Sequence, residues 1–300
     1  MNTLTPMKRV ALIASLVFLW GISWSIYKVA LAYTPPVLFA GLRTLIGGLL
    51  LIIIMLPRRR LIRWKQNWRA YAISGLLNVA LFYGLQTVGL MYLPSGLFSV
   101  LVYLQPVLVG LFAWMWLGES MSWRKVIGLL LGFAGVISVS AGGFSGHVAV
   151  VGVVLALVTA LSWALGTVFI KKANQTTDAL WMVAFQCTLG GALLTAAGSV
   201  TENWSDITWN TPYWFGLIFG IIFGIALSWM IYFTLVGAGD ASKVASYTFL
   251  VPLLSVFIGT LLLHEPFTWF LLLGLVLIGV SIYLVNRKPR RTSVLAGVDR

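Results

Sequence analysis

Polar and aromatic side chains recur at helical spacing inside long apolar stretches of this chain. In one stretch, Trp20, Trp24 and Lys28 follow at intervals of four residues, which places them on one face of a helix. Aromatic rings could stack on the apolar part of a small molecule, while amide or guanidinium groups bind its polar end. Polar groups are costly in lipid and usually face a bundle interior or a wet cavity, so we expect them to line a substrate cavity. The predicted lining comprises Trp24, Arg43, Asn78, Tyr83, Gln86, Ser99, Tyr103, Trp163, Thr167, Trp229, Tyr232 and Tyr247.

A structural role is the alternative for several of these residues. A single Ser or Thr in an apolar helix often makes an interhelical hydrogen bond, worth about 0.6 kcal/mol. Trp24 and Trp229 could equally be packing residues. Large side chains near mid-helix, such as Asn78 and Trp163, favour the cavity more strongly.

The elements that must position these residues are membrane-spanning helices. Of 300 residues, 60% are hydrophobic and only 9% are charged. Because a crossing needs about 20 apolar residues, the chain supplies about ten crossings and leaves no room for a soluble domain. This composition excludes a soluble enzyme, a disordered protein and a disulfide scaffold, and Cys187 has no second cysteine to pair with. Runs of this length span lipid only as helices. The runs are Val10–Ala30, Val37–Leu56, Trp68–Leu90, Ser95–Leu117, Lys125–Ala141, Ala149–Ile170, Ala179–Val200, Tyr213–Val236, Val244–Leu263 and Phe267–Val285.

Basic residues predict the orientation of these helices. The net charge of +13 would suggest nucleic acid in a soluble chain, but here the Lys and Arg residues gather in alternate loops. Eighteen of the twenty lie on one side, and Lys28 and Arg43 are the exceptions. By the positive-inside rule, both termini are cytoplasmic. The first run continues to Ala30 without a convincing cleavage site, so we expect a retained helix and not a signal peptide.

The chain repeats itself. A shift of 143 residues superposes Trp20 on Trp163, Lys28 on Lys171 and Gly47–Gly48 on Gly190–Gly191, and a shift of 146 superposes Pro106 on Pro252, Glu119 on Glu265 and Gly128 on Gly274. Each half holds five helices, and because five is odd, the second half enters the membrane inverted. Inverted repeats are typical of alternating-access transporters, whose site lies between the halves near the midplane. We therefore predict two five-helix repeats, residues 8–142 and 149–286, and a basic cytoplasmic tail, residues 287–300.

Several motifs resemble those of a known family. The first half contains WGISWSIYKVAL, PxxxxAGLRTLIGGLLL and LGESMSWRKVIGLLLGFAGV, and the second contains LSWALGTVFIKKA and LHEPFTWFLLLGLVLIGV. These are similar to the two EamA repeats of the drug/metabolite transporter superfamily, and the resemblance covers nearly the whole chain. It implies ten helices around a central cavity, with the fifth and tenth peripheral, and export of small metabolites. Exporters of aromatic amino acids (the YddG type), of other amino acids and of drugs all belong to this group, and membership does not choose among them.

Arg43 lies about one and a half turns inside its predicted helix. Its guanidinium could hold a substrate carboxylate, or it could bind backbone carbonyls or extend to the outer surface. The second half has Gln186 at the equivalent position, so the repeat does not require the charge. Pro106 and Pro252 stand at symmetric mid-helix places, where each is expected to kink its helix. The kinks would free the carbonyls of Val102 and Thr248, as part of a gate or as a static bend.

The distribution of acids and histidines limits the mechanism. All seven acids (Glu119, Asp178, Glu202, Asp206, Asp240, Glu265 and Asp299) and both histidines (His147 and His264) lie outside the mid-membrane parts of the runs. A proton pump built on an embedded acid is therefore disfavoured, and facilitated diffusion or exchange is favoured. A membrane enzyme would need a nucleophile with a base, a carboxylate pair or metal ligands at depth. The sequence offers none of these, and neither an ATP-binding motif nor a channel selectivity filter.

We therefore predict a multi-pass transporter of the plasma membrane (bacterial inner membrane) that exports small metabolites. Amino acids, particularly aromatic or apolar ones, are the favoured substrates, because Trp and Tyr faces would stack on an apolar side chain. The alternative is an exporter of lipophilic or weakly cationic drugs, coupled to an ion gradient and binding through cation–π contacts. We expect no cofactor, no metal and no nucleic-acid partner, and a monomer in contact with the lipid bilayer.

Overall fold

The computed structural model describes residues 4–89, 92, 98, 101–140, 150–173, 177–254, 258 and 269–286. Among these residues, the secondary structure is helical and contains no strand. Six stretches of the described chain are long and apolar enough to cross a membrane, and three shorter apolar helices accompany them. The prediction of an all-α membrane protein is confirmed.

The first half begins with two long helices and a basic connection. Pro occupies the first turn of α1 and of α2, where its missing N–H breaks no hydrogen bond. The helices of this half are α1 (Pro6–Leu31), α2 (Pro36–Met55), the 3₁₀ segment η1 (Leu56–Leu61), α3 (Trp64–Gly75), the π-helical segment η2 (Leu76–Leu81), α4 (Phe82–Gly89), α6 (Gln105–Leu117) and α7 (Trp123–Ser140). Gly118 ends α6 in the left-handed conformation, with φ of 67°, which glycine adopts without strain.

The second half follows a similar order. Asp178 caps the start of α9 by accepting the N–H groups of Leu180 and Trp181 at 3.1 and 3.0 Å. Its helices are α8 (Val150–Ala173), α9 (Ala179–Thr201), the 3₁₀ segment η4 (Trp204–Asp206), α10 (Thr211–Phe219), the π-helical segment η5 (Gly220–Leu227), α11 (Ser228–Ala238), α12 (Ala241–Tyr247) and α14 (Trp269–Asn286).

Helices α2 and α9 pack closely together through small residues. A Cβ atom added at Gly48 would collide with the backbone of Thr188, and one added at Gly191 would collide with Leu45. Such close approach provides van der Waals packing, which replaces the hydrophobic effect inside lipid. Adding 143 converts Gly48 into Gly191 and Leu45 into Thr188, so the two contacts are equivalent and exchanged.

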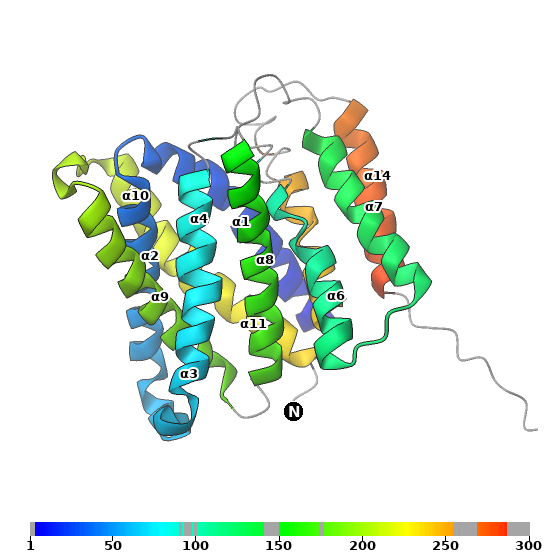
Figure 1. The fold of residues 1–300 in the computed structure, drawn as a ribbon, viewed down its shortest axis with the longest axis horizontal. Helices are drawn as coiled ribbons and strands as arrows, with labels where there is room; N and C mark the ends of the chain where they lie inside the picture. The colour runs from blue at the N-terminus through cyan, green and yellow to red at the C-terminus, as the bar shows by residue number, and fades with distance from the viewer. Residues whose placement is uncertain are drawn as a thin grey trace, which may run out of the picture.

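Helices α7 and α14 form a second pair of the same kind. They lie side by side at one edge of the bundle, opposite the edge formed by α2, α9 and α10 (Figure 1). A Cβ atom on Gly128 would lie 3.2 Å from the carbonyl oxygen of Ser281, and one on Gly135 would lie 3.1 Å from that of Gly274. A shift of 146 exchanges these two contacts. The peripheral place implied for the fifth and tenth helices matches this arrangement.

Both halves interrupt their helices at matching positions. The π-helical segments η2 and η5 end at Leu81 and Leu227, which are 146 residues apart. Turns occupy residues 103–104 and 248–249, just before the segments that contain Pro106 and Pro252. The predicted mid-helix prolines therefore lie near the start of new helical segments.

The expectation that the carbonyl of Thr248 is free is wrong. Its oxygen accepts the N–H of Val251 at 3.0 Å, in a bond that spans three residues. A tight turn of this kind satisfies the carbonyl that an uninterrupted helix with proline would have left unpaired.

Candidate functional site

A small cavity lies in the middle of the bundle. Its volume is about 60 Å³, and its described lining comes from α1, α4, α8, α11 and the turn before α6. The lining residues are Trp20, Ser23, Phe82, Tyr83, Gln86, Val102, Tyr103, Trp163 and Trp229. None of them carries a charge, and six of the nine are aromatic. In this conformation there is room for about two water molecules, so a larger substrate requires the lining side chains to move apart.

Two pairs of equivalent aromatic residues meet at this cavity. Trp20 and Trp163, which the shift of 143 superposes, have ring centroids 5.6 Å apart in an edge-to-face arrangement. Tyr83 and Trp229 are 146 residues apart, and Trp229 Nε1 donates a hydrogen bond to Tyr83 Oη at 3.0 Å. Edge-to-face rings of this type attract each other by about 1 kcal/mol beyond their buried area. The two halves therefore contribute matching rings to one site.

Two polar atoms of the lining have no hydrogen-bond partner among the described residues. They are Gln86 Oε1 and Trp163 Nε1, on side chains that are 8% and 4% exposed. A buried unpaired polar atom costs about 1–3 kcal/mol. One of these atoms is an acceptor and the other a donor, so a ligand with a donor and an acceptor of its own could satisfy both.

A hydrogen-bonded group adjoins the cavity on the side of α6. Tyr232 Oη lies 3.2 Å from Thr167 Oγ1, and Gln105 Nε2 donates to it at 3.4 Å. The ring of Tyr232 is 5.3 Å from that of Trp20. Gln105 is fully buried, and its Oε1 has no described partner. The sequence analysis did not select Gln105, although its place beside Pro106 at a break in an apolar run would have been a usable signal.

Arg43 is buried behind Tyr83 and does not line the cavity. It is 4% exposed, and its Cζ lies 4.2 Å from the ring centroid of Tyr27 and 4.5 Å from that of Tyr83. No described acid pairs with it, and its Nε has no described hydrogen-bond partner. Cation–π contacts are worth about 2 kcal/mol when desolvated, whereas burial of an unpaired charge costs several kcal/mol. The guanidinium is therefore left without full compensation.

Asn78 belongs to a helix interface and not to the cavity lining. Its Nδ2 donates to Ser74 Oγ at 3.4 Å and to Gln186 Oε1 at 3.3 Å. The expected common face of Ser74, Asn78 and Gln86 is not formed, because η2 lies between the first two residues and the third. A π-helical turn contains an extra residue, which rotates the following residues relative to a regular helix. Asn78 thus faces α9, whereas Gln86 reaches the cavity.

The remaining predicted site residues have different outcomes. Tyr83, Gln86, Tyr103, Trp163 and Trp229 line the cavity together. Tyr247 is half-buried in α12 and does not line it. The side chain of Trp24 and all of Ser99 lie outside the described residues.

Sequence reasoning did not select Trp20 and Phe82 for the site, although both line the cavity. The repeat itself marks Trp20, because its equivalent is Trp163. No sequence signal marks Phe82, since a phenylalanine in an apolar helix usually faces lipid or core.

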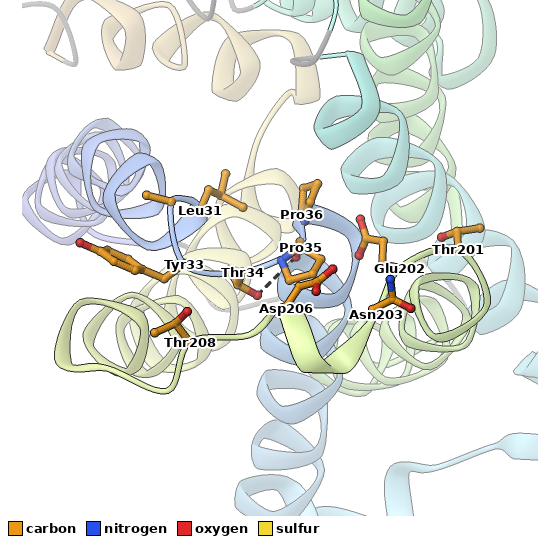
Figure 2. A pocket seen from close by; sticks show the side chains of 11 residues that line it. Leu31, Tyr33, Thr34, Pro35, Pro36, Thr201, Glu202, Asn203, Asp206 and Thr208 are labelled. Atoms are coloured by element: carbon orange, nitrogen blue, oxygen red, sulfur yellow. Dashed lines mark hydrogen bonds between the residues drawn. The ribbon is translucent and has the colours of Figure 1, made fainter.

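A larger depression lies at the end of the bundle where α1 leads into α2 and α9 leads into α10. Its volume is about 450 Å³, and Tyr33, Glu202 and Asp206 are among its lining residues (Figure 2). Glu202 accepts the backbone N–H groups of Val37 and Leu38 at 2.9 and 2.7 Å, so its carboxylate caps α2. None of the predicted site residues borders this depression. The central cavity is the better candidate site, because it gathers buried aromatic and unpaired polar groups.

The charged residues at the opposite end hold the two halves together. Glu119 accepts the N–H of Ala241 at 2.6 Å and forms an ion pair with Lys125 at 3.3 Å. Lys171 donates to the carbonyl of Val236 at 2.6 Å, at the end of α11. The structural role expected for Glu119 agrees with these contacts, whereas Glu265 lies outside the described residues.

Comparisons with known proteins can now be set beside this geometry. A model of the EamA-like transporter family matches residues 7–141 and 150–287. The chain is 55% identical to the "Uncharacterized transporter YvbV" of Bacillus subtilis, over 99% of this chain and 97% of that protein. It is 28% identical to the "Probable amino-acid metabolite efflux pump" of Escherichia coli, over 89% of this chain and 91% of that protein. A crystal structure of a chain 20% identical superposes with a TM-score of 0.81, over 94% of this chain and 97% of that chain, which shows a shared fold.

Proposed function

The chain belongs to the EamA-like transporter family, and we propose that it exports amino acids, with aromatic and other apolar ones favoured. It is a multi-pass protein of the plasma membrane, in agreement with its apolar helices and its bacterial relatives. The relatives named as amino-acid metabolite efflux pumps, at 26–28% identity, support the substrate class.

The proposed architecture is two inverted five-helix repeats with both termini in the cytoplasm. The exchanged contacts of α2 with α9 and of α7 with α14 support a twofold relationship between the halves. The family model matches the chain twice, with limits close to the proposed repeats 8–142 and 149–286. Alternating access then consists of movement of one repeat against the other around the central site.

The observation that carries the proposed substrate is the lining of the central cavity. Aromatic rings of both halves, including Trp163 and Trp229, surround the unpaired Gln86 Oε1 and Trp163 Nε1. Rings stack on an apolar side chain, and the amide oxygen and indole N–H would bind an amino group and a carboxylate. Pro106 and Pro252, at the helix breaks beside the site, are proposed to permit its opening.

The proposed transport is passive or by exchange. Each described acid (Glu119, Asp178, Glu202, Asp206 and Asp240) lies at a helix end or in a connection. None of them reaches the cavity lining, so the described part of the chain offers no carboxylate for a proton relay there. The proposed working unit is a monomer in the bilayer.

Counterflow in proteoliposomes tests this function. Vesicles with purified protein are preloaded with unlabelled phenylalanine, and labelled phenylalanine is added outside without an ion gradient. We expect transient accumulation of label that other aromatic amino acids suppress. Trp163→Ala and Tyr103→Ala should each reduce the initial rate by about tenfold, because each loses a ring that contacts the substrate. Trp114→Ala, a matched change at a residue 51% exposed on the outside of α6, should keep the original rate.

Two results would contradict this function. One is absence of counterflow in sealed vesicles with folded protein; the other is an unchanged rate in both cavity variants. The alternative, export of lipophilic or weakly cationic drugs, rests on the same aromatic faces, which also attract cations. It predicts that such drugs, and not amino acids, exchange, and that an ion gradient is required.

A further inference from the structure

We infer that Arg43 makes this transporter select substrates that carry a carboxylate and reject amines that lack one. The inference rests on the proposed function and names the chemical class within it. It assigns a role to the charge that lies behind the cavity wall.

The first step is the state of the guanidinium. Arg43 is 4% exposed, and aromatic rings of Tyr27, Phe39 and Tyr83 surround it at 4.2, 5.7 and 4.5 Å. Its Nε has no described partner, and the described ion pairs join other residues. Rings compensate a buried cation only in part, so an anion that approaches Arg43 gains more than it would beside a paired arginine.

The second step is the position of Tyr83 between this charge and the cavity. Tyr83 lines the cavity, while Arg43 lies against its ring and is absent from the lining. A carboxylate in the cavity is therefore about one ring thickness from the guanidinium. If Tyr83 leaves its hydrogen bond with Trp229, the carboxylate can contact Arg43 directly, in the paired geometry that a guanidinium offers.

The third step is the effect on cations. No described lining residue is charged, so an ammonium group in the cavity meets no carboxylate. It meets only the field of Arg43, which repels it, and this field is strong where water is scarce. A zwitterion keeps a net attraction when its carboxylate points towards Arg43, whereas an amine without a carboxylate has nothing to offset the repulsion.

The second half of the chain supplies a suitable substitution. Gln186 of α9 is the equivalent of Arg43 of α2, is fully buried, and hydrogen-bonds with Ser74 and Asn78. A glutamine is thus compatible with this place in a repeat. Arg43→Gln removes the charge and keeps polar hydrogen-bonding groups.

Competition against phenylalanine counterflow tests the inference. Phenylpropionate retains the ring and carboxylate, and phenethylamine retains the ring and amine. In the wild type we expect phenethylamine to inhibit at least about tenfold more weakly than phenylpropionate. In Arg43→Gln the difference should fall below about threefold, with slower counterflow, while Arg43→Lys should keep most of it. Arg69→Gln is the matched control, because Arg69 also contacts a ring, that of Trp68, but is exposed.

The outcomes separate this inference from the proposed function. Equal inhibition by the two compounds in the wild type, with phenylalanine counterflow present, overturns the inference alone. The same holds if Arg43→Gln keeps the full difference. Absence of phenylalanine counterflow overturns both. If Arg43→Gln fails to fold, the wild type and Arg43→Lys still decide, because each preserves the charge.

Discussion

Tyr83 and Trp229 are equivalent residues of the two halves, and a hydrogen bond of 3.0 Å joins them at the wall of the cavity. Trp229 is 1% exposed and Tyr83 is 7% exposed, so water cannot easily replace the bond. This contact ties one half to the other at the place where Arg43 approaches the site. It is also the contact that must break if Tyr83 moves towards or away from a substrate.

Removal of this bond should destabilise the protein. In Tyr83→Phe, the indole N–H of Trp229 remains buried without a partner, and we expect a loss of about 1–3 kcal/mol in the free energy of unfolding. The melting temperature of the purified protein in detergent measures the effect. Tyr92→Phe removes a hydroxyl from a residue that is 48% exposed and serves as the control. Equal melting temperatures for the two variants would show that the hydrogen bond contributes nothing.

Close packing of α2 against α9 should tolerate no added methyl group. In Gly48→Ala, the new Cβ collides with the backbone of Thr188, which cannot move without displacing α9. Overpacking of this kind costs about 1–3 kcal/mol. Gly279→Ala is the control, because a Cβ there meets no described atom within 4 Å, and alanine favours helix. Measured melting temperatures should fall for the first variant and stay level or rise for the second; the opposite order would refute the packing argument.

The carboxylate of Glu119 should stabilise the junction between α6 and α12. It accepts the N–H of Ala241 and pairs with Lys125, and both side chains of the pair are less than 10% exposed. Glu119→Gln leaves Lys125 buried without its counter-charge, and we expect a loss of about 3 kcal/mol. A double-mutant cycle with Lys125→Met checks the cause. If the pair matters, the double variant is less destabilised than the sum of the two single variants.

The acid at the start of α12 should make stability depend weakly on pH. Partial burial alone would raise the pKa of Asp240, but its hydrogen bond to Lys243 and the charges of Lys243, Lys125 and Lys171 lower it overall. A lowered folded-state pKa means that ionised Asp240 stabilises the protein above its unfolded value of about 3.9. This contribution is lost as the pH falls through the lowered value.

We therefore expect Asp240→Asn to reduce the decline in melting temperature between about pH 5 and pH 3. The change should correspond to less than about 1 kcal/mol, because the ion pair with Lys243 is partly exposed. Asp206→Asn, at an exposed acid of η4, is the comparison. An identical pH profile for wild type and Asp240→Asn would rule out this contribution.

The sequence by itself determined that the chain is an all-helical membrane protein of this family. Hydropathy and composition report averages over about 20 residues, and lipid permits only structures that satisfy every backbone group internally. The matched residues of the two halves, such as Trp20 with Trp163, were also legible as a repeat. These features need no knowledge of how any one side chain is oriented.

The tertiary structure decided which polar and aromatic residues share a site. The extra residue of η2 separates Asn78 from Gln86, and packing against Tyr27 and Tyr83 places Arg43 behind the wall instead of in the lining. Phe82 enters the lining for the same local reason, although its residue type carries no signal. The face that a residue presents depends on helix register and on neighbouring helices, and a π-helical turn changes that register without changing the hydrophobicity from which the helix was predicted.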